Sequence, residues 1–413
     1  MKRKLVRYVL AMGLLLTVSV GLNTVSANDD VTVDSLVAYV KSHGADPLEF
    51  SLNALKKHDL IIFDDALHNA VEPFGFYQDL IADKRFSTAA TIIFFEIFTM
   101  DSQPALDAYL NAKEEDITLL YPAFHLAAFN GWRYRTYLEI MKSIRHANLN
   151  APVGSPMLRA VGVSPPSYWS EIETPADFKL YDESNFWARD HFMYRAIIAE
   201  LDAIEGTKGI FLTNTRHAYT GLRDRAGKLM WNTGTFFSQW QPERTISVRF
   251  NAPFLNITKQ KKKTEGLATS QGLEKVVYSW SRAHGGMWDR AFAKAGNEPV
   301  AVLLKGSPFG QAPYIGNRML QARSGQTMAD VNDAVIHLKP IKNWHQSAIF
   351  HQIYTPAFKT EIARRYKAAY SPDELKQFLS KQKMSSLEEF ANMLAESAPQ
   401  KLNSISQSLA DTN

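Results

Sequence analysis

The chain has 413 residues, no cysteine, and 46 Lys plus Arg against 42 Asp plus Glu. The absence of cysteine excludes disulfide bonds, thiolate metal ligands and covalent haem attachment. Four of the cations lie within the first seven residues, so the rest of the chain carries equal numbers of basic and acidic side chains. This balance gives no indication of a nucleic-acid partner.

The N-terminal segment has the pattern of a secretion signal. Cations at positions 2–7 precede an apolar run from about 8 to 20, and Ala27 ends a stretch of small residues suited to cleavage. We therefore expect a signal peptide over 1–27, cleaved after Ala27, and a periplasmic or secreted mature protein. No later segment approaches about 18 uninterrupted apolar residues, so we expect no integral membrane segment in the mature chain.

Short apolar runs then alternate with helical patterns along the chain. This alternation predicts an α/β domain over 28–345, with a mostly parallel central sheet of about seven strands flanked by helices. The expected strands span residues 59–64, 91–96, 158–163, 209–213, 245–250, 299–304 and 333–338. The main helices are expected at 31–57, 72–82, 186–205 and 272–295, with further helical segments between 103 and 147.

Residues 346–413 are predicted to form a helical C-terminal extension. Ser371 and Glu374 have the spacing of a capping box, with Pro372 at the first helical position, and a second helix is expected at 386–396. Three long loops are expected to shape the mouth of a ligand pocket, at 164–185, 258–271 and 305–328.

Three of the predicted strands stop on polar residues that can carry chemistry. The apolar runs that end at positions 63, 95 and 212 are each followed directly by polar side chains, and two of these ends have a histidine close behind. The carboxyl ends of parallel strands share one rim of a sheet, where ligands collect. The side chains that this pattern brings to one rim are Asp65, His68, Glu96, Asn214 and His217.

Two kinds of chemistry suit this set. A histidine can take a proton from water near neutral pH, and a buried carboxylate can hold its ring in the required tautomer. The same nitrogen and oxygen atoms also form a plausible ligand set for a divalent metal, which would lower the pKa of a bound water. Spacing alone does not separate these two interpretations.

Arg189 and Asp190 lie near the start of the predicted helix at 186–205. Asp190 is favourable there through the helix dipole. A cation at a helix N-terminus is unfavourable without an anionic partner, so Arg189 is expected either to pair with the carboxylates of the site or to contact the substrate.

Five segments resemble motifs of a known superfamily that contains erythromycin-esterase-like proteins, the haem-binding ChaN proteins and the more distant TraB/Tiki group. Asp64–His68 occupies the place of a Gly-Glu-x-x-His motif, and Phe95–Leu110 resembles the ChaN pattern of a Glu followed by Gln-Pro-Ala-Leu-Asp. Arg189–Met193 resembles an Arg-Asp-x-x-Met helix, Leu212–Ala218 a His-Asn-x-His strand end, and Asn332–Ile336 the last strand.

The resemblance implies roles for particular residues. His68 would be the water-activating base, with Glu96 and Asp65 orienting it and His217 assisting. The chain departs from the motifs in two places, because Asp64-Asp65 replaces Gly-Glu and the first His of His-Asn-x-His is missing. The resemblance implies no single substrate, since its members range from macrolide lactone hydrolysis to haem binding and peptide cleavage.

We therefore expect an exported hydrolase that acts on an ester, lactone or amide. The expected catalytic residues are His68, Glu96, Asp65 and His217, and the expected substrate-binding residues are Arg189 and Asn214. Two alternatives remain open: a protein that binds haem or another small ligand, and a metal-dependent peptidase. If a metal is present, its expected ligands are His68, Glu96 and His217.

Overall fold

The structure is a computed structural model that describes residues 31–261, 274–318 and 321–396. The predicted signal peptide over 1–27 therefore lies outside the described residues. Across the described ranges, no helix combines the length and the apolar character needed to cross a bilayer.

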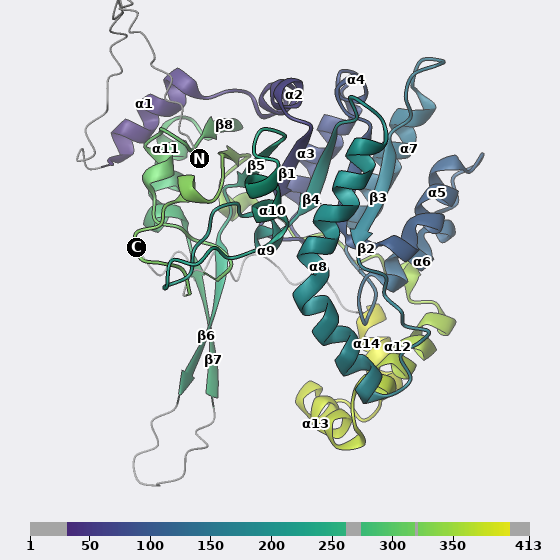
Figure 1. The fold of residues 1–413 in the computed structure, drawn as a ribbon. Helices are drawn as coiled ribbons and strands as arrows, with labels where there is room; N and C mark the ends of the chain where they lie inside the picture. The colour runs from purple at the N-terminus through teal and green to yellow at the C-terminus, as the bar shows by residue number, and fades with distance from the viewer. Residues whose placement is uncertain (1–30, 262–273, 319–320, 397–413) are drawn as a thin grey trace, which may run out of the picture. The chain divides into compact units, whose positions relative to one another are not determined.

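A seven-stranded sheet runs through the described chain in the order β3-β2-β4-β1-β5-β9-β8 (Figure 1). Its strands are β1 (Leu60–Asp64), β2 (Ile92–Thr99), β3 (Arg159–Ser164), β4 (Gly209–Thr213), β5 (Thr245–Phe250), β8 (Val300–Leu303) and β9 (Ala334–His337). Neighbouring strands are parallel except β8 and β9, which are antiparallel. The predicted α/β class with a mostly parallel sheet is confirmed.

The helices that flank and extend this sheet are α1 (Val33–His43), α2 (Pro47–Lys57), α3 (Val71–Ala82), α4 (Phe86–Ala89), α5 (Gln103–Asn111), α6 (Tyr121–Leu126), α7 (Arg135–Leu149), α8 (Pro175–Ala203), α9 (Thr215–Ala218), α10 (Thr233–Trp240), α11 (Met287–Lys294), α12 (Pro356–Ala369), α13 (Pro372–Gln382) and α14 (Leu387–Glu396). Alternate residues of a strand point to opposite faces of a sheet. Leu60 and Ile62 of β1 accordingly pack with apolar residues of α8 and α10. Ile61 and Phe63 belong to the larger core on the other face, which includes residues of α3, α7, α12 and α14.

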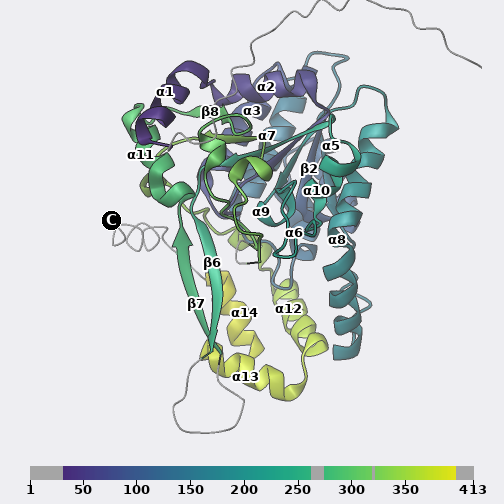
Figure 2. The same ribbon diagram turned by 60° about the vertical axis from the view of Figure 1, so that its left-hand side comes forward.

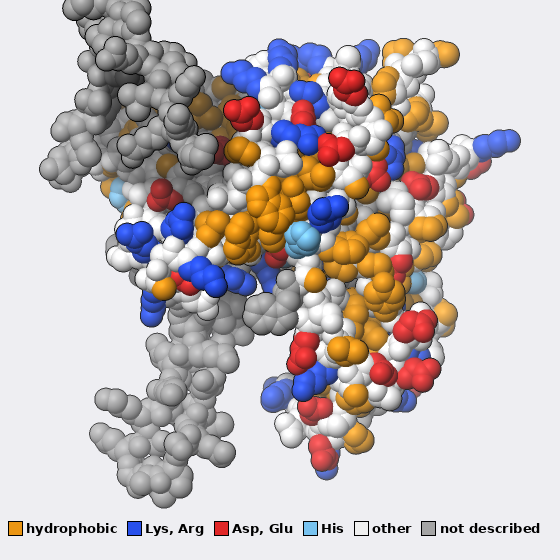
Figure 3. Space-filling model, in the orientation of Figure 1, with side chains coloured by type: hydrophobic (Ala, Val, Ile, Leu, Met, Phe, Trp, Pro, Cys, Tyr) orange, Lys and Arg blue, Asp and Glu red, His pale blue; other side chains and the backbone are white. Residues whose placement is uncertain are grey.

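Rings on α8 and α10 hold these two helices against each other. Tyr194 of α8 lies 4.9 Å from Phe237 of α10, between ring centroids, and His191 lies 5.1 Å from Phe236. Trp240 stacks on the same group, 4.9 Å from Phe236. Hydrophobic side chains gather over α10 and α8 on the face seen in Figure 3.

The helix predicted at 186–205 begins much earlier than expected. α8 starts at Pro175, because Thr174 and Asp177 form a capping box around a proline at the first helical position. The loop predicted at 164–185 is correspondingly shorter. Arg189 and its neighbour therefore lie in the middle of a long helix, and the helix-dipole explanation for Asp190 is wrong.

The helix predicted at 272–295 is also wrong over its first half. Glu274–Ser281 is strand β7, which pairs antiparallel with β6 (Phe254–Lys261), and α11 begins only at Met287. The sequence Val-Val-Tyr-Ser-Trp within β7 has the β-branched and aromatic residues that favour a strand. The predicted loop at 258–271 belongs to β6 as far as residue 261, and the rest of it lies outside the described residues.

Two other elements differ from their predicted bounds. The helix expected over 31–57 is divided into α1 and α2, because Asp46 caps a new helix that opens with Pro47. β2 continues through Thr99, so Glu96 lies inside this strand and not after its end. This position buries the Glu96 side chain between the neighbouring strands and α8.

The C-terminal helices include the two that the sequence predicts. Ser371 caps α13 in the expected capping box, and α14 covers most of the predicted 386–396 segment. α12 was not predicted. Figures 1 and 2 show these helices and the β6–β7 hairpin extending beyond the same end of the sheet.

Candidate functional site

Polar and ionisable side chains gather at the carboxyl ends of β1 and β4, beside the middle of β2 and the middle of α8. We call this group the rim cluster. Its members are Asp65, His68, Glu96, Arg189, Asp190, Asn214 and His217. The six residues that sequence analysis selected are thus brought together, and Asp190 joins them. Their catalytic and binding roles remain predictions.

His68 follows β1 and is held in one orientation. Its Nδ1 donates to Asp65 Oδ2 at 2.9 Å, and the Tyr137 hydroxyl lies 3.1 Å from the same nitrogen. The edge of its ring meets Trp132, with centroids 5.2 Å apart. Asp65 itself is buried, and its Oδ1 has no partner. A buried carboxylate that fixes an imidazole is the arrangement a general base requires.

The Glu96 carboxylate contacts basic side chains from three other segments of the chain. Its Oε2 accepts a hydrogen bond from Thr213 Oγ1 at 2.7 Å and lies 3.5 Å from His68 Nε2. Its Oε1 accepts from Arg189 Nη2 at 3.0 Å and lies 3.2 Å from His217 Nε2. One buried carboxylate therefore fixes a guanidinium and two imidazoles relative to each other.

His217 is buried, with 1% of its side chain exposed. Its Nδ1 lies 2.7 Å from Asp190 Oδ1. That oxygen also accepts hydrogen bonds from the backbone N–H and the hydroxyl of Thr233, at 2.8 and 2.9 Å. Both nitrogens of His217 are therefore occupied by carboxylates, so this residue holds Glu96 in place and does not face a ligand.

Asn214 caps helix α9 and also contacts His68. Its Oδ1 accepts from the backbone N–H of Arg216 at 2.9 Å, which caps α9. This bond turns the amide nitrogen toward His68, and Nδ2 lies 2.7 Å from His68 Nε2. Because an amide nitrogen only donates, the contact suits a neutral His68 ring that accepts at Nε2.

The neighbouring carboxylates favour the protonated form of His68 instead. Burial lowers the pKa of His68, but the Asp65 and Glu96 carboxylates outweigh it and raise that pKa to about 9. Burial likewise raises the pKa of Asp65 to about 6. Burial would raise the pKa of Glu96, but the two imidazoles and the guanidinium beside it hold it well below its usual range. The resting cluster near neutral pH thus contains an ionised Glu96 and a protonated His68, opposed only by the Asn214 contact.

Three charged members of the cluster reach the surface. The Arg189 side chain is 32% exposed, that of Asp190 22% and that of His68 17%, whereas that of Glu96 is 4% exposed. Because Asp190 is held by His217 and Thr233, the groups that a ligand approaching this edge of the sheet would meet are His68 and Arg189.

The histidines of the cluster do not fit a metal or a haem iron as they are arranged. Among the described residues, no three His, Asp or Glu side chains are placed so that they could hold a metal ion. His217 has a carboxylate on each nitrogen, and His68 is engaged by Asp65 at one nitrogen and by Asn214 at the other. Both nitrogens of His217 are therefore closed to a further ligand, and His68 Nε2 is open to one only after it leaves the Asn214 amide.

A buried pair beside the cluster was missed by sequence analysis. Arg249 of β5 lies opposite Asp64 in the parallel register, and its Nη1 donates to the carbonyl oxygen of Ile315. Arg249 Nη2 and Asp64 Oδ2 are buried without a partner. The sequence does contain a sign of this pair, since Arg249 interrupts an otherwise uncharged strand. A buried cation needs a counter-charge, so an acidic side chain was to be expected on a neighbouring strand.

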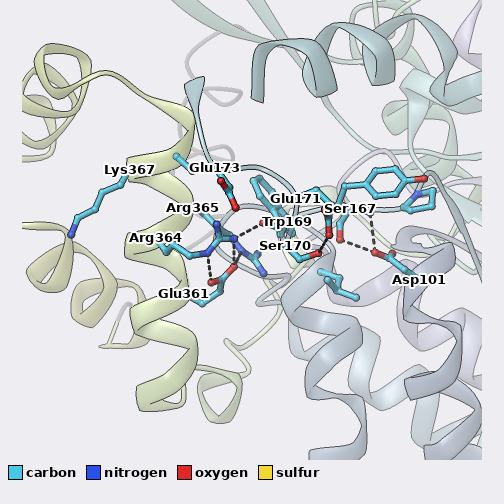
Figure 4. A pocket seen from close by; sticks show the side chains of 14 residues that line it. Asp101, Ser167, Trp169, Ser170, Glu171, Glu173, Glu361, Arg364, Arg365 and Lys367 are labelled. Atoms are coloured by element: carbon cyan, nitrogen blue, oxygen red, sulfur yellow. Dashed lines mark hydrogen bonds and ion pairs between the residues drawn. The ribbon is translucent and has the colours of Figure 1, made fainter. Parts of the chain in front are cut away.

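A cavity of about 1100 Å³ opens at the carboxyl ends of β2 and β3, against α12 (Figure 4). Three of its charged side chains pair with one another, since Glu361 accepts from Arg364 at 2.7 Å and from Arg365 at 2.9 Å. Asp101 accepts from the Ser167 hydroxyl at 2.9 Å. No member of the rim cluster lines this cavity. These paired groups attach α12 to the loop after β3.

Comparison with known proteins gives structural neighbours only. No family model and no curated protein matches the chain. A solved succinoglycan biosynthesis protein is similar with a TM-score of 0.50 and 10% identity, over 76% of this chain and 98% of that one. A mutant of the erythromycin esterase EreC in its open conformation is similar with a TM-score of 0.45 and 12% identity, over 70% of this chain and 92% of the other.

The solved structures that are similar also include the haem-binding ChaN of Campylobacter jejuni. Its TM-score is 0.31 and its identity 12%, over 56% of this chain and 91% of that chain. Two of the three groups that the sequence motifs resemble are represented among these similar structures. At these identities the neighbours show the α/β fold alone.

Proposed function

We propose that the protein is a hydrolase of esters, lactones or amides in which His68 activates water. The observation that supports this most is the arrangement of two partly exposed groups on one buried carboxylate. Glu96 lies 3.5 Å from the His68 ring and accepts a hydrogen bond from the Arg189 guanidinium at 3.0 Å. An imidazole and a cation are therefore held side by side at the surface, on a rigid buried support.

In this proposal water displaces the Asn214 amide from His68 Nε2. The neutral form of the ring, whose share rises as the pH approaches the His68 pKa of about 9, takes a proton from that water at Nε2. The oxygen of the water bonds to the carbonyl carbon of the substrate. Asp65, bonded to Nδ1, stabilises the imidazolium that forms. The Arg189 guanidinium stabilises the negative charge that develops on the carbonyl oxygen. The imidazolium then returns its proton to the leaving oxygen or nitrogen as the carbonyl carbon releases it.

His217 has a different role from the one expected on the sequence. With both nitrogens bound to carboxylates and 1% of its side chain exposed, it does not reach a substrate oxygen. We assign it as a positioning residue that acts through Glu96. Its replacement is expected to change the pH profile of the reaction as well as the rate, because it supports the charge next to His68.

The proposal is tested with p-nitrophenyl esters, a γ-lactone and an anilide as substrates. We expect His68→Gln to lower kcat by a factor of about 10² to 10⁴, the usual contribution of a positioned general base. His146→Ala is the matched control, because His146 is an exposed histidine on α7 outside the cluster. Undiminished turnover by His68→Gln, or no turnover of any substrate by the native protein, would contradict the proposal.

Haem titration separates this proposal from a ligand-carrier role. Because both ring nitrogens of His217 are held by carboxylates, and His68 Nε2 binds water in this proposal, we expect no Soret shift that depends on either residue. A shift that disappears in His68→Gln would favour haem binding over hydrolysis.

We also propose export and a two-part mature chain, with an α/β domain over 28–345 and a helical extension over 346–413. The N-terminal pattern of the sequence supports export. Expression in a Gram-negative host followed by mass measurement is expected to give a periplasmic protein that begins at Asn28. A cytoplasmic protein that retains residues 1–27 would contradict export.

A further inference from the structure

A second cavity, of about 760 Å³, lies at the other end of the same sheet edge. Its walls come from the end of β7, the turn before α11, α11 itself and the loop after β9. We call it the α11 cavity. The lining residues that can carry charge are Arg282, Asp289, Arg290, His337 and Lys342. None of them belongs to the rim cluster.

Positive charge exceeds negative charge in this lining. Arg282, Arg290 and Lys342 face one carboxylate, that of Asp289. Asp289 Oδ1 accepts a hydrogen bond from Asn251 Nδ2 at 3.1 Å, and its Oδ2 is buried without a hydrogen-bond partner. Among the described residues, Arg282 Nε is also buried without a partner, and Arg290 Nη1 reaches only the carbonyl oxygen of Gly285, at 3.5 Å. One carboxylate thus faces three cations, and the lining keeps a net positive charge.

The backbone at the cavity adds donors. His284, Gly285 and Gly286 are three successive residues in the left-handed region, with φ of 49°, 58° and 80°. Such a conformation is costly for histidine, and it directs the chain into the N-terminus of α11. Gly286 is the N-cap of this helix, and no side chain caps it. The Met287 N–H donates to the His284 carbonyl oxygen, and the remaining N–H groups of the first turn, together with the helix dipole, favour an anion at this position.

His337 provides the independent observation. This side chain lines the cavity with 1% exposure, and its Nε2 has no partner. Its Nδ1 lies 3.5 Å from Asn251 Nδ2, and because an amide nitrogen donates, the ring carries its hydrogen on Nε2. The ring also stacks on Phe292 with centroids 4.3 Å apart, which fixes its direction. A buried N–H without an acceptor is costly, and a ligand oxygen would remove that cost.

We propose that the α11 cavity binds an oxyanion, the phosphate or carboxylate group of a small molecule. The guanidinium groups of Arg282 and Arg290 supply charge, and the N-terminus of α11 and His337 Nε2–H supply fixed donors. Lys342 adds an exposed cation at the mouth. This site is separate from the rim cluster, and the proposal stands whether or not the protein is a hydrolase.

Calorimetric titration of the full chain with inorganic phosphate and with citrate tests the proposal, at an ionic strength held constant with sodium chloride. We expect saturable binding of at least one anion, weakened tenfold or more in Arg290→Gln and in His337→Gln. Lys294→Gln is the matched control, because Lys294 lies on the same helix, carries the same charge and pairs with Asp34 outside the cavity.

The Arg290→Gln variant separates loss of anion binding from loss of folding. Arg290 is exposed, so its replacement leaves the core intact, and the melting temperature without anion should equal that of the native protein. Binding of neither anion by the native protein would overturn the proposal. Equal affinity of Arg290→Gln and native protein, or equal weakening in Lys294→Gln, would also overturn it.

Discussion

His68 and His337 lie on the same edge of one sheet, and their pKa values are displaced in opposite directions. Burial acts to lower both. Beside His68, the Asp65 and Glu96 carboxylates outweigh burial and raise the pKa to about 9. Beside His337 there is an Asn251 amide in place of a carboxylate, and burial lowers the pKa to about 4.

The difference shows that the partner of a buried histidine decides its charge, and with it the kind of chemistry it can do. The His68 ring is held near ionised carboxylates and can exchange a proton. The His337 ring stays neutral and offers one fixed N–H. A proton-transfer site and an anion-binding site can thus be built from the same residue type, two strands apart.

Loss of the Glu96 charge is the largest change that this comparison predicts. Glu96→Gln leaves the buried His217 next to a neutral amide and removes the carboxylate that pairs with the partly exposed Arg189, so we expect the free energy of unfolding to fall by about 3 to 5 kcal/mol. Urea denaturation at pH 7 measures it. The control is Glu200→Gln, which removes an exposed ion pair with Arg159 and should cost less than about 1 kcal/mol. A loss from Glu96→Gln no larger than from the control would contradict the role given to this carboxylate.

His68 should make stability depend on alkaline pH. Because its folded pKa of about 9 lies above the ordinary value of 6.5, its contribution is complete below pH 6.5 and is lost as pH rises through 9. The integrated effect is about 3 kcal/mol. We expect the difference in unfolding free energy between native protein and His68→Gln to shrink by that amount between pH 6.5 and 10. A difference that is constant over this range would show that the carboxylates do not raise the pKa of His68.

A carboxylate placed beside His337 should convert it toward the behaviour of His68. Asn251→Asp puts that charge 3.5 Å from the ring, and an opposite charge at such a distance raises a histidine pKa by about 1 to 3 units. Titration of the His337 ring protons by NMR measures the shift. Asn251→Leu, which removes the amide without adding charge, is the control and should leave the pKa low. Equal pKa values of His337 in the two variants would contradict the claim that the side chain at position 251 sets the pKa of this histidine.

The smallest predicted effect concerns the outer support of the rim cluster. Thr233→Val removes the hydroxyl that lies 2.9 Å from Asp190 Oδ1 and 3.2 Å from the Asp190 carbonyl oxygen, and it keeps the backbone N–H bond to Oδ1. We expect a loss of about 1 kcal/mol in unfolding free energy, because the acceptor keeps other donors. A thermal melt compared with Thr220→Val, a partly exposed threonine, checks it. A loss above about 3 kcal/mol would mean that Asp190 depends on this hydroxyl more than the geometry indicates.

Much of the rim cluster could be predicted because its residues stand next to the strands that carry them. Apolar runs that stop at Asp64 and Thr213 are visible in the sequence and mark strand ends, which a parallel sheet places on one edge. Glu96 also follows an apolar run, but it joins the cluster from inside β2, which continues to Thr99. Arg189 was selected for an electrostatic reason, but its place in mid-helix could not be found until the start of α8 at Pro175 was known. The contact of Arg189 with Glu96 depends on that length.

The α11 cavity could not be predicted from local pattern. Glu274–Ser281 becomes a strand because β6 pairs with it, and this pairing joins segments separated by residues that carry no periodic signal. The histidine and two glycines that turn the chain into α11 take left-handed conformations that only the surrounding structure imposes. His337 was placed in a strand, but nothing in the sequence shows which atom of its ring lacks a partner.

The most direct test of the account is a histidine titration by NMR on the native protein, with His68→Gln and His337→Gln used to assign the two rings. The account predicts one pKa near 9 for His68 and one near 4 for His337. Two ordinary values between about 6 and 7 would contradict it, because they would mean that neither the carboxylates of the rim cluster nor the burial of His337 acts as the structure indicates.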